Sequence, residues 1–310
     1  MNIAITGSTG LLGFNLTNYY AKMGHNVFVL LRDEFYKVKL EDNVNKIYGN
    51  INSKQDVDYF IQKSLPDRFI HLAAQTQAYD SLKYPYNTFY TNIIGTLNVL
   101  ESLREYGKCS AIVIASSDKA YGELQGKEYL ESHALNGVYP YDASKSMTDM
   151  VSFSYKKTYG MPIATTRACN MYGPGDSNQE RLIPGIINCY IEDKVFNIRN
   201  NGEDIREYIY IDDVVSAYDH ILKYIESGGD ESAFNISSND RYSTMEVFNS
   251  VNSYLENKTK FEISTAKSLE IRKQFMNSKL LKDKTGWLPS ASFNEKIKET
   301  VDWYINFLGK

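Results

Sequence analysis

The segment Gly7-Ser8-Thr9-Gly10-Leu11-Leu12-Gly13 decides the fold of this chain. It directly follows residues 3–6, which are short and apolar enough for a buried strand, and a helical pattern over residues 11–23 begins inside it. The backbone amides at the start of such a helix can hold a pyrophosphate, and the missing Cβ atoms let the phosphate and the neighbouring strand approach closely. Because the glycines stand at a strand-to-helix turn, the segment predicts dinucleotide binding rather than only a tight turn.

The first half of the chain alternates short apolar stretches with longer amphipathic ones. Five stretches are expected to be buried strands: residues 3–6, 27–31, 69–72, 111–116 and 163–167. Four stretches are expected to be helices: residues 11–23, 56–63, 87–106 and 141–159. This alternation predicts an α/β fold with a doubly wound parallel sheet and helices on both of its faces.

The pattern changes from about residue 173, where Gly173-Pro174-Gly175 precedes scattered short strands. Separate helices are expected near residues 214–225, 244–255 and 294–307. The sequence therefore predicts a first domain of residues 1–172 and a smaller, mixed α/β portion of residues 173–310. The return of some C-terminal segments to the first domain stays open.

The composition excludes several classes of protein. The chain has 310 residues, a net charge of −4, a pI near 5.7 and no cluster of Lys and Arg, so neither nucleic acid nor a membrane surface is expected as a partner. No apolar run approaches the roughly 20 residues of a membrane span, and strand-like sequence from Asn2 onward leaves no room for a secretory leader. Three cysteines without Cys-x-x-Cys spacing favour a reducing cytoplasm, and four scattered histidines predict no metal site.

A second chemical signal is Tyr141-Asp142-Ala143-Ser144-Lys145, which places a phenol and an ammonium four residues apart on one helix face. A nearby cation stabilises a phenolate and lowers the pKa of a tyrosine from its usual value of about 10, so Tyr141 is a candidate proton acceptor for an alcohol being oxidised. The chain has 25 tyrosines, and the pair gains its meaning only beside the glycine segment.

Together, these two segments make the chain resemble the short-chain dehydrogenase/reductase superfamily, in its extended branch that acts on nucleotide sugars. The resemblance covers nearly the whole chain. Its other motifs are His71-Leu72-Ala73-Ala74-Gln75, Asn92-Ile93-Ile94-Gly95-Thr96, Ser116-Ser117, Arg167 with Asn170-Met171-Tyr172-Gly173-Pro174, Arg206-Glu207-Tyr208-Ile209-Tyr210-Ile211-Asp212-Asp213 and Thr285-Gly286-Trp287-Leu288-Pro289. It implies a Rossmann-type domain for NAD(P), a C-terminal portion for a nucleoside-diphosphate sugar, and a homodimer joined through residues 87–106 and 141–159.

The resemblance also implies the site residues. A Ser-Tyr-Lys catalytic set falls on Ser117, Tyr141 and Lys145. The cofactor is expected to meet Gly7, Thr9, Gly10, Leu11, Leu12, Gly13, Arg32, Asp33, Asn50, Ile51, Leu72, Ala73, Ala74, Ala115, Tyr141 and Lys145. The substrate is expected to meet Gln75, Ser117, Asn170, Arg181, Leu182, Ile183 and Arg206, with the Arg206 guanidinium suited to the diphosphate unless it forms a structural salt bridge.

The choice between NAD and NADP is read at the end of the second strand, and its signals conflict. Asp33 lies about 20 residues past Gly13, which suits the ribose hydroxyls of NAD, whereas Arg32 beside it suits the phosphate of NADP. Both can also be solvated loop charges. Counted as in the family, the usual acidic position falls on Leu31 and is followed by Arg32, a pattern that slightly favours NADP.

The reaction is indicated by Asp118 and Lys119, which follow Ser117. Asp-Lys here resembles CDP-glucose 4,6-dehydratases, whereas epimerases carry small, non-ionisable residues at this place. In a dehydratase, Tyr141 takes the C4 hydroxyl proton and the resulting 4-ketone acidifies the C5 hydrogen. Lys119 is the candidate base at C5, and Asp118 is the candidate acid for the departing C6 oxygen, with its pKa raised by burial.

The expected product is a 4-keto-6-deoxy sugar, as in deoxysugar biosynthesis, but other interpretations stay open. Asp118 and Lys119 could form an exposed turn pair worth under about 1 kcal/mol, and Lys119 could only position the substrate. A nucleotide-sugar 4-epimerase would need Tyr141 and Lys145 without the acid at position 118. A non-catalytic protein that kept the fold is disfavoured because both Tyr141 and Lys145 are present.

Overall fold

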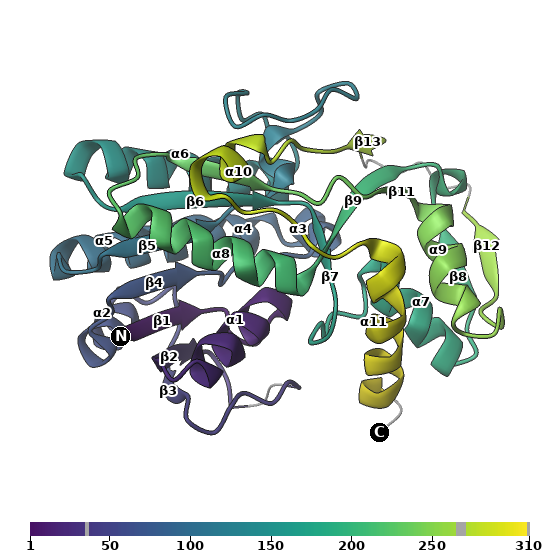
Figure 1. The fold of residues 1–310 in the computed structure, drawn as a ribbon, viewed down its shortest axis with the longest axis horizontal. Helices are drawn as coiled ribbons and strands as arrows, with labels where there is room; N and C mark the ends of the chain where they lie inside the picture. Colours follow the sequence, from purple (N-terminus) through teal and green to yellow (C-terminus); the bar gives the residue numbers. More distant parts are fainter. Residues whose placement is uncertain (35–36, 265–270, 309–310) are drawn as a thin grey trace.

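The computed structural model describes residues 1–34, 37–264 and 271–308, and its main layer is a seven-stranded parallel sheet (Figure 1). The strand order is β10-β6-β5-β4-β1-β2-β3. The strands are β1 (Asn2–Thr6), β2 (Asn26–Leu31), β3 (Asn45–Tyr48), β4 (Arg68–His71), β5 (Ala111–Ala115), β6 (Ile163–Ala168) and β10 (Ala233–Ile236). Every neighbouring pair runs parallel, so the predicted α/β fold with a doubly wound sheet is confirmed.

Helices cover both faces of this sheet, and β1 shows why its sequence requires them. Successive side chains of a strand point to opposite faces, so Ile3 and Ile5 enter one hydrophobic core and Ala4 enters the other. The first core is shared with α1 (Leu11–Lys22) and α8 (Ile211–Glu226), and the second with α2 (Lys54–Ser64) and α5 (Gly95–Tyr106). A strand buried on both faces must be apolar throughout, as residues 3–5 are.

The predicted helix over residues 141–159 is α6 (Pro140–Tyr159), but the one predicted over residues 87–106 is interrupted. It consists of α4 (Pro85–Phe89), a π-helical turn η1 (Tyr90–Ile94) and α5. The interruption lies at Asn92, whose Nδ2 donates to the Gln75 carbonyl at 3.0 Å and to Ser144 Oγ at 2.8 Å. A π-turn inserts an extra residue into a helix, and here it places this buried amide between two neighbouring segments.

Strands from β7 onward form two small sheets on the other side of the molecule (Figure 1). One joins β7 (Asn170–Tyr172), β9 (Ile205–Tyr210), β11 (Arg241–Ser243) and β13 (Lys273–Gln274), and the other joins β8 (Phe196–Ile198) and β12 (Phe261–Ile263). Their helices are α7 (Leu182–Ile191), α9 (Thr244–Ser253) and α11 (Phe293–Leu308). The remaining short helices are α3 (Ala78–Lys83), η2 (Asp118–Tyr121), η3 (Asn200–Gly202) and α10 (Lys279–Thr285).

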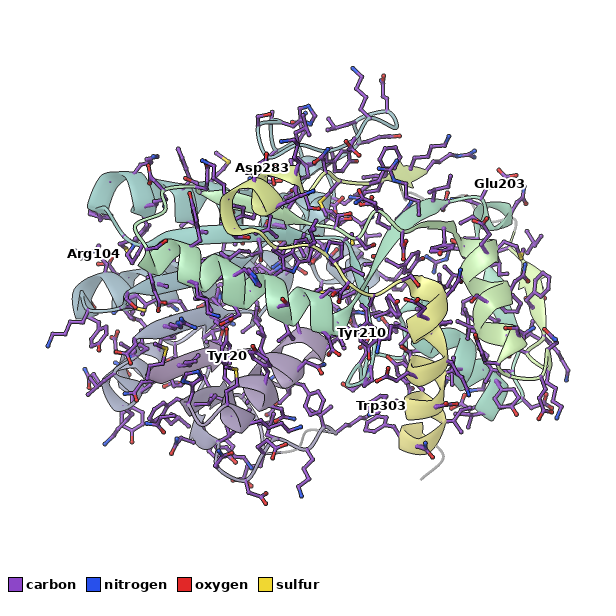
Figure 2. The ribbon with its side chains drawn as sticks, in the orientation of Figure 1. Tyr20, Arg104, Glu203, Tyr210, Asp283 and Trp303 are labelled. Carbon is purple, nitrogen blue, oxygen red and sulfur yellow. The ribbon has the colours of Figure 1, made fainter. Side chains whose placement is uncertain are left out.

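Two C-terminal elements lie with the first sheet. Strand β10 pairs with β6, and α8 packs against α1 and β5 (Figure 1). Polar contacts fasten α8 there: Arg68 of β4 donates to Glu226 Oε2 at 2.7 Å, and the hydroxyl of Tyr20, the residue of α1 labelled in Figure 2, donates to Asp219 Oδ1 at 3.4 Å. The domain boundary at residue 172 stays a prediction.

Within residues 1–34, 37–264 and 271–308, no helix combines the length and apolar character needed to cross a membrane.

The glycine segment brings two pieces of backbone into direct contact. A Cβ on Gly13, in the first turn of α1, would lie 2.1 Å from the Gly7 carbonyl oxygen, and a Cβ on Gly7 would lie 2.6 Å from the Ala73 amide nitrogen. Gly7 also has a φ of +74°, a backbone conformation that residues with a side chain rarely adopt. A Cβ on Gly10 would come no closer than 3.6 Å to its nearest neighbour, the Gly7 oxygen. The first and third glycines are therefore required by the fold, whereas Gly10 is required only by what fills the space in front of it.

These contacts predict opposite results for two alanine substitutions. Gly13→Ala should lower the free energy of unfolding by about 3 kcal/mol, because an added Cβ must displace backbone. Gly10→Ala should leave it within about 0.5 kcal/mol, because the Cβ meets its nearest neighbour only at an ordinary van der Waals distance of 3.6 Å. Denaturant unfolding of both variants checks this, and equal destabilisation of the two would contradict the assignment.

Candidate active site

A cavity of about 1230 Å³ opens beside the carboxyl ends of the parallel strands and extends to the C-terminal sheets. Gly7 to Gly13 line one end, Ser117 and Tyr141 line the middle, and Phe196 of β8 with Arg206 of β9 line the other end. This is the place where an open α/β sheet usually binds its ligands. Two chemically different halves therefore share one space.

The residues predicted to hold the cofactor meet along the first half. All of them line the cavity, namely Gly7, Thr9, Gly10, Leu11, Leu12, Gly13, Arg32, Asp33, Asn50, Ile51, Leu72, Ala73, Ala74, Ala115, Tyr141 and Lys145. They come from the carboxyl ends of β1, β2, β3, β4 and β5, from the first turn of α1 and from α6. Their shared location fits an extended ligand that crosses the sheet, and their binding roles stay predictions.

The glycine end fits a pyrophosphate. Gly10 is the N-cap of α1 and supplies no side-chain cap, and the first turn has no acidic residue. The amides there are thus left for an anion, which the helix dipole also favours. Ser8 lines the cavity beside them, and its buried hydroxyl finds no partner in the described parts of the chain. An unpaired buried hydroxyl is costly, so it too favours a polar ligand here.

The acid and base that bear on cofactor choice form an ion pair. Arg32 Nε donates to Asp33 Oδ2 at 2.9 Å, and their side chains are 80% and 58% exposed. The preceding residue, Leu31, is buried in the core. The first polar groups available at the end of β2 are therefore these two opposite charges.

The structure brings the predicted catalytic residues together. Lys145 and Tyr141 lie on α6, and Ser117 begins the short helix η2 after β5. The Ser117 hydroxyl donates to Asp118 Oδ1 at 3.0 Å and lies close enough to the Tyr141 phenol to lower its pKa. Lys145 Nζ donates to the Ala115 carbonyl at 2.8 Å. All of these residues line the same cavity.

The pKa values of Tyr141 and Lys145 differ from what the sequence predicts. Burial raises the pKa of Tyr141 to about 12, with the Ser117 hydrogen bond opposing it, and burial lowers the pKa of Lys145 to about 8. The expected lowering of the tyrosine pKa by Lys145 is therefore wrong for the protein alone. The physical reason is that both groups lose water, while the ammonium is directed to the Ala115 carbonyl.

Asp118 is not part of an exposed turn pair. Its side chain is buried, and burial raises its pKa against the opposing effects of the Lys119 charge, the Ser117 hydrogen bond and the Arg206 charge. Lys119 is partly buried and lines the cavity with it. A carboxyl group with a raised pKa beside a tyrosine and a serine can donate a proton to a ligand.

Most residues predicted to bind substrate also line the cavity: Ser117, Asn170, Arg181, Leu182, Ile183 and Arg206. Arg206 is buried and donates to the Ile205 carbonyl at 2.9 Å. Gln75 is the exception, because it does not line this cavity. Its backbone N–H donates to Asn92 Oδ1 at 2.7 Å. The structure does not bring Gln75 to the other substrate residues.

Asp176 and Tyr304 are among the residues of the cavity wall that sequence reasoning missed. Asp176 follows Gly173-Pro174-Gly175 directly, so the turn signal pointed to its neighbourhood. Tyr304 had no local signal, because it comes from the C-terminal helix α11 and reaches the site only through the tertiary fold. His71, by contrast, is a structural residue: its ring bonds to Thr6 Oγ1 at 2.7 Å and Thr96 Oγ1 at 3.1 Å, and burial lowers its pKa to about 3.

Comparisons with known proteins agree with this architecture. The chain is 32% identical over 268 residues to a dTDP-D-glucose 4,6-dehydratase of Dictyostelium discoideum, covering 79% of this chain and 60% of that one. It spans about half the length of other curated relatives that it matches.

Two solved structures are similar over almost their full length. A UDP-glucose 4-epimerase of Thermotoga maritima with UDP-glucose has a TM-score of 0.91 and 26% identity, covering 99% of this chain and 100% of that one. A dTDP-glucose 4,6-dehydratase of Bacillus anthracis in complex with NAD has a TM-score of 0.85 and 25% identity, covering 99% and 97%. The model of the NAD dependent epimerase/dehydratase family matches residues 3–237, and the chain, with its glycine segment and its Ser117, Tyr141 and Lys145, belongs to that family.

Proposed function

We propose that this chain is a nucleoside-diphosphate-hexose 4,6-dehydratase, a lyase that acts on a CDP-glucose-like substrate and forms a 4-keto-6-deoxy sugar. The observation that carries the proposal is the buried carboxyl group of Asp118, whose pKa is raised by burial and whose Oδ1 lies 3.0 Å from Ser117 Oγ. Oxidation at C4 alone would need no such acid. Elimination of water from C5 and C6 does need one.

The residues divide the reaction between them. Tyr141 accepts the proton of the C4 hydroxyl, and the nearby Ser117 hydroxyl lowers the pKa of its phenol. Lys119 then removes the C5 proton, which the new 4-ketone has acidified. Asp118 gives its proton to the departing C6 oxygen, so that water leaves. NAD, when bound, would supply the acceptor for the C4 hydride and its return to C6. C5 takes up a proton as the hydride returns, so water is the only group lost and no net oxidation results.

A 4-epimerase is the second candidate. The structure of the Thermotoga maritima epimerase is similar over the whole chain, and Ser117, Tyr141 and Lys145 would serve an epimerase equally well. Such an enzyme has no chemical use for a proton donor at position 118. The two candidates therefore differ in one side chain whose role can be tested directly.

The proposed cofactor is NAD. The comparisons do not support the preference for NADP that Arg32 suggested, since the family is NAD dependent. The ion pair offers a physical reason: a 2′-phosphate would meet the Asp33 carboxylate beside Arg32, whereas ribose hydroxyls can donate to that carboxylate. We assign the nucleotide-sugar substrate to the other half of the cavity, with Arg181 and Arg206 as cations for the diphosphate.

The homodimer is also part of the proposal. Helix α6 exposes Met147, Met150 and Phe153, and neighbouring segments expose Tyr86 and Tyr90. Side chains of this kind gathered on adjacent helices mark a surface that favours burial. Light scattering should give twice the 35.5 kDa mass of the chain, and a stable monomer would contradict the dimer.

Asp118→Asn tests the dehydratase most simply. The amide keeps the shape of the side chain but cannot donate a carboxyl proton, so dehydration should slow by a factor of about 10² to 10⁴. The initial oxidation, followed as NADH absorbance in single turnover, should survive. The matched control is Glu123→Gln, an exposed acid outside the cavity, which should turn over as the wild type does. Wild-type turnover in Asp118→Asn would remove the acid from the mechanism.

The dependence of turnover on pH tests the state of Lys145. Its pKa is lowered to about 8 by burial, so the ammonium is present below that pH and is lost above it. If the charged form assists Tyr141, kcat/KM should fall as the pH rises through about 8. Lys145→Arg should turn over more slowly, but its kcat/KM should no longer fall as the pH rises through about 8, because a guanidinium stays protonated. If kcat/KM of Lys145→Arg still falls through the same pH range, the titration belongs to another group.

Cofactor choice can be measured without substrate. Wild-type protein should bind NAD more tightly than NADP, and Asp33→Asn should weaken NAD binding about fivefold, because a charged hydrogen-bond acceptor is lost. Arg32→Ala should leave NAD binding within about twofold, since an exposed ion pair contributes little. Calorimetric titration of the cofactor-free protein gives both constants, and tighter binding of NADP by the wild type would overturn the choice.

A further inference from the structure

The segment from residue 173 to 181 connects the two halves of the cavity. It leaves β7 and ends at Arg181, the N-cap of α7. Its start is held on α1: Asn15 Nδ2 donates to the Pro174 carbonyl at 2.9 Å, and a Cβ on Gly175 would lie 2.3 Å from the Phe14 ring. The helix that begins at the glycine segment thus also fixes the loop that leads to Arg181.

Asp176 lies at the centre of this loop. It is 4% exposed and lines the cavity, and its Oδ2 accepts from Arg181 Nη1 at 3.2 Å. Its Oδ1 accepts the Asn178 amide proton at 3.0 Å, which fixes the orientation of the carboxylate. The Arg181 side chain is 36% exposed and also lines the cavity. A buried, oriented acid therefore holds one edge of a guanidinium whose remaining part faces open space.

The C-terminal helix completes the cluster. Tyr304 of α11 is buried and lines the cavity. Helix α11 packs against α7, the helix that Arg181 caps. The neighbouring Trp303 is labelled on α11 in Figure 2. Burial raises the pKa of Tyr304, with Asp176 adding to the effect and Arg181 opposing it, so both charges lie close to its hydroxyl. Arg181 also opposes the effect of burial on Tyr141. The Arg181 charge therefore acts both on the C-terminal helix and on the catalytic tyrosine.

We infer that Asp176 is a positioning residue, which orients the Arg181 guanidinium toward the diphosphate of a nucleotide sugar and so sets the hexose against Tyr141. The inference rests on the proposed nucleotide-sugar substrate. A free arginine side chain must lose rotamer freedom to bind an anion in one geometry. An arginine already held at Nη1 loses less, and Arg181 lines the cavity in which the diphosphate would bind.

The sign of the effect separates positioning from simple charge balance. If Asp176 only offset the charge of Arg181, its removal would strengthen the attraction of the site for a diphosphate. If Asp176 orients Arg181, its removal weakens binding although the site becomes more positive. Asp176→Asn suits this test, because the amide oxygen can still accept the Asn178 amide proton.

The experiment is a double-mutant cycle on Asp176→Asn and Arg181→Ala, with calorimetric titration of CDP, UDP, dTDP and GDP into the NAD-bound protein. Each single variant should bind the preferred nucleoside diphosphate about tenfold more weakly than the wild type. The double variant should bind no more weakly than Arg181→Ala alone. In turnover, Asp176→Asn should raise KM by a similar factor and change kcat less, and Asp176→Glu should recover part of the loss.

The control is Glu128→Gln, which alters another acid–arginine pair, Glu128 with Arg241 at 2.8 Å, outside the cavity. It should bind as the wild type does. Tighter or unchanged binding by Asp176→Asn, or additive losses in the double variant, would overturn the positioning role while leaving the dehydratase intact. Absence of nucleoside-diphosphate binding by the wild type would instead contradict the proposed function itself.

Discussion

The contact between Gly13 and Gly7 is the constraint on which the site depends. Two backbones meet where a Cβ would lie 2.1 Å from a carbonyl oxygen, so α1 must start directly at the end of β1 with its amides facing the cavity. The same helix carries Phe14 and Asn15, which hold Gly175 and Pro174. The pyrophosphate end and the loop to Arg181 are thus built on one rigid element, and a shift of α1 would disturb both halves of the cavity.

A buried ion pair plays the corresponding role for the catalytic helix. Asp149, one turn after Lys145 on α6, accepts from Arg167 Nη2 at 3.0 Å, and Arg167 Nη1 donates to the Tyr121 hydroxyl at 2.7 Å. Tyr121 closes the η2 turn that carries Asp118 and in turn donates to Asn235 of β10 at 2.7 Å. Removing one member would leave a buried charge or polar group unpaired, at a cost of about 3–5 kcal/mol for the ion pair. The return of β10 to the sheet therefore supports the acid as well as the fold.

Sequence reasoning identified the parts of the molecule whose constraints are local. The glycine segment, the apolar strands and α6 depend on periodicity and turn chemistry that short stretches display. It could not foresee the π-turn at Asn92, which forms because one amide bonds to Gln75 and Ser144 from distant segments. Nor could it foresee that Gln75 does not line the cavity or that Tyr304 does, since both depend on tertiary packing. The pKa of Tyr141 was misjudged for the same reason: the spacing to Lys145 is local, but the burial that raises the pKa is not.

The central claim is that Asp118 makes this cavity a dehydratase, and the mass of the product tests it most directly. The wild-type protein is incubated with CDP-, dTDP-, GDP- and UDP-hexoses in ordinary and in deuterated water. The account predicts that one substrate loses the mass of one water and gains one deuteron from the solvent, because the C5 proton exchanges during elimination. A substrate that equilibrates with its C4 epimer at unchanged mass would contradict the account and establish the epimerase.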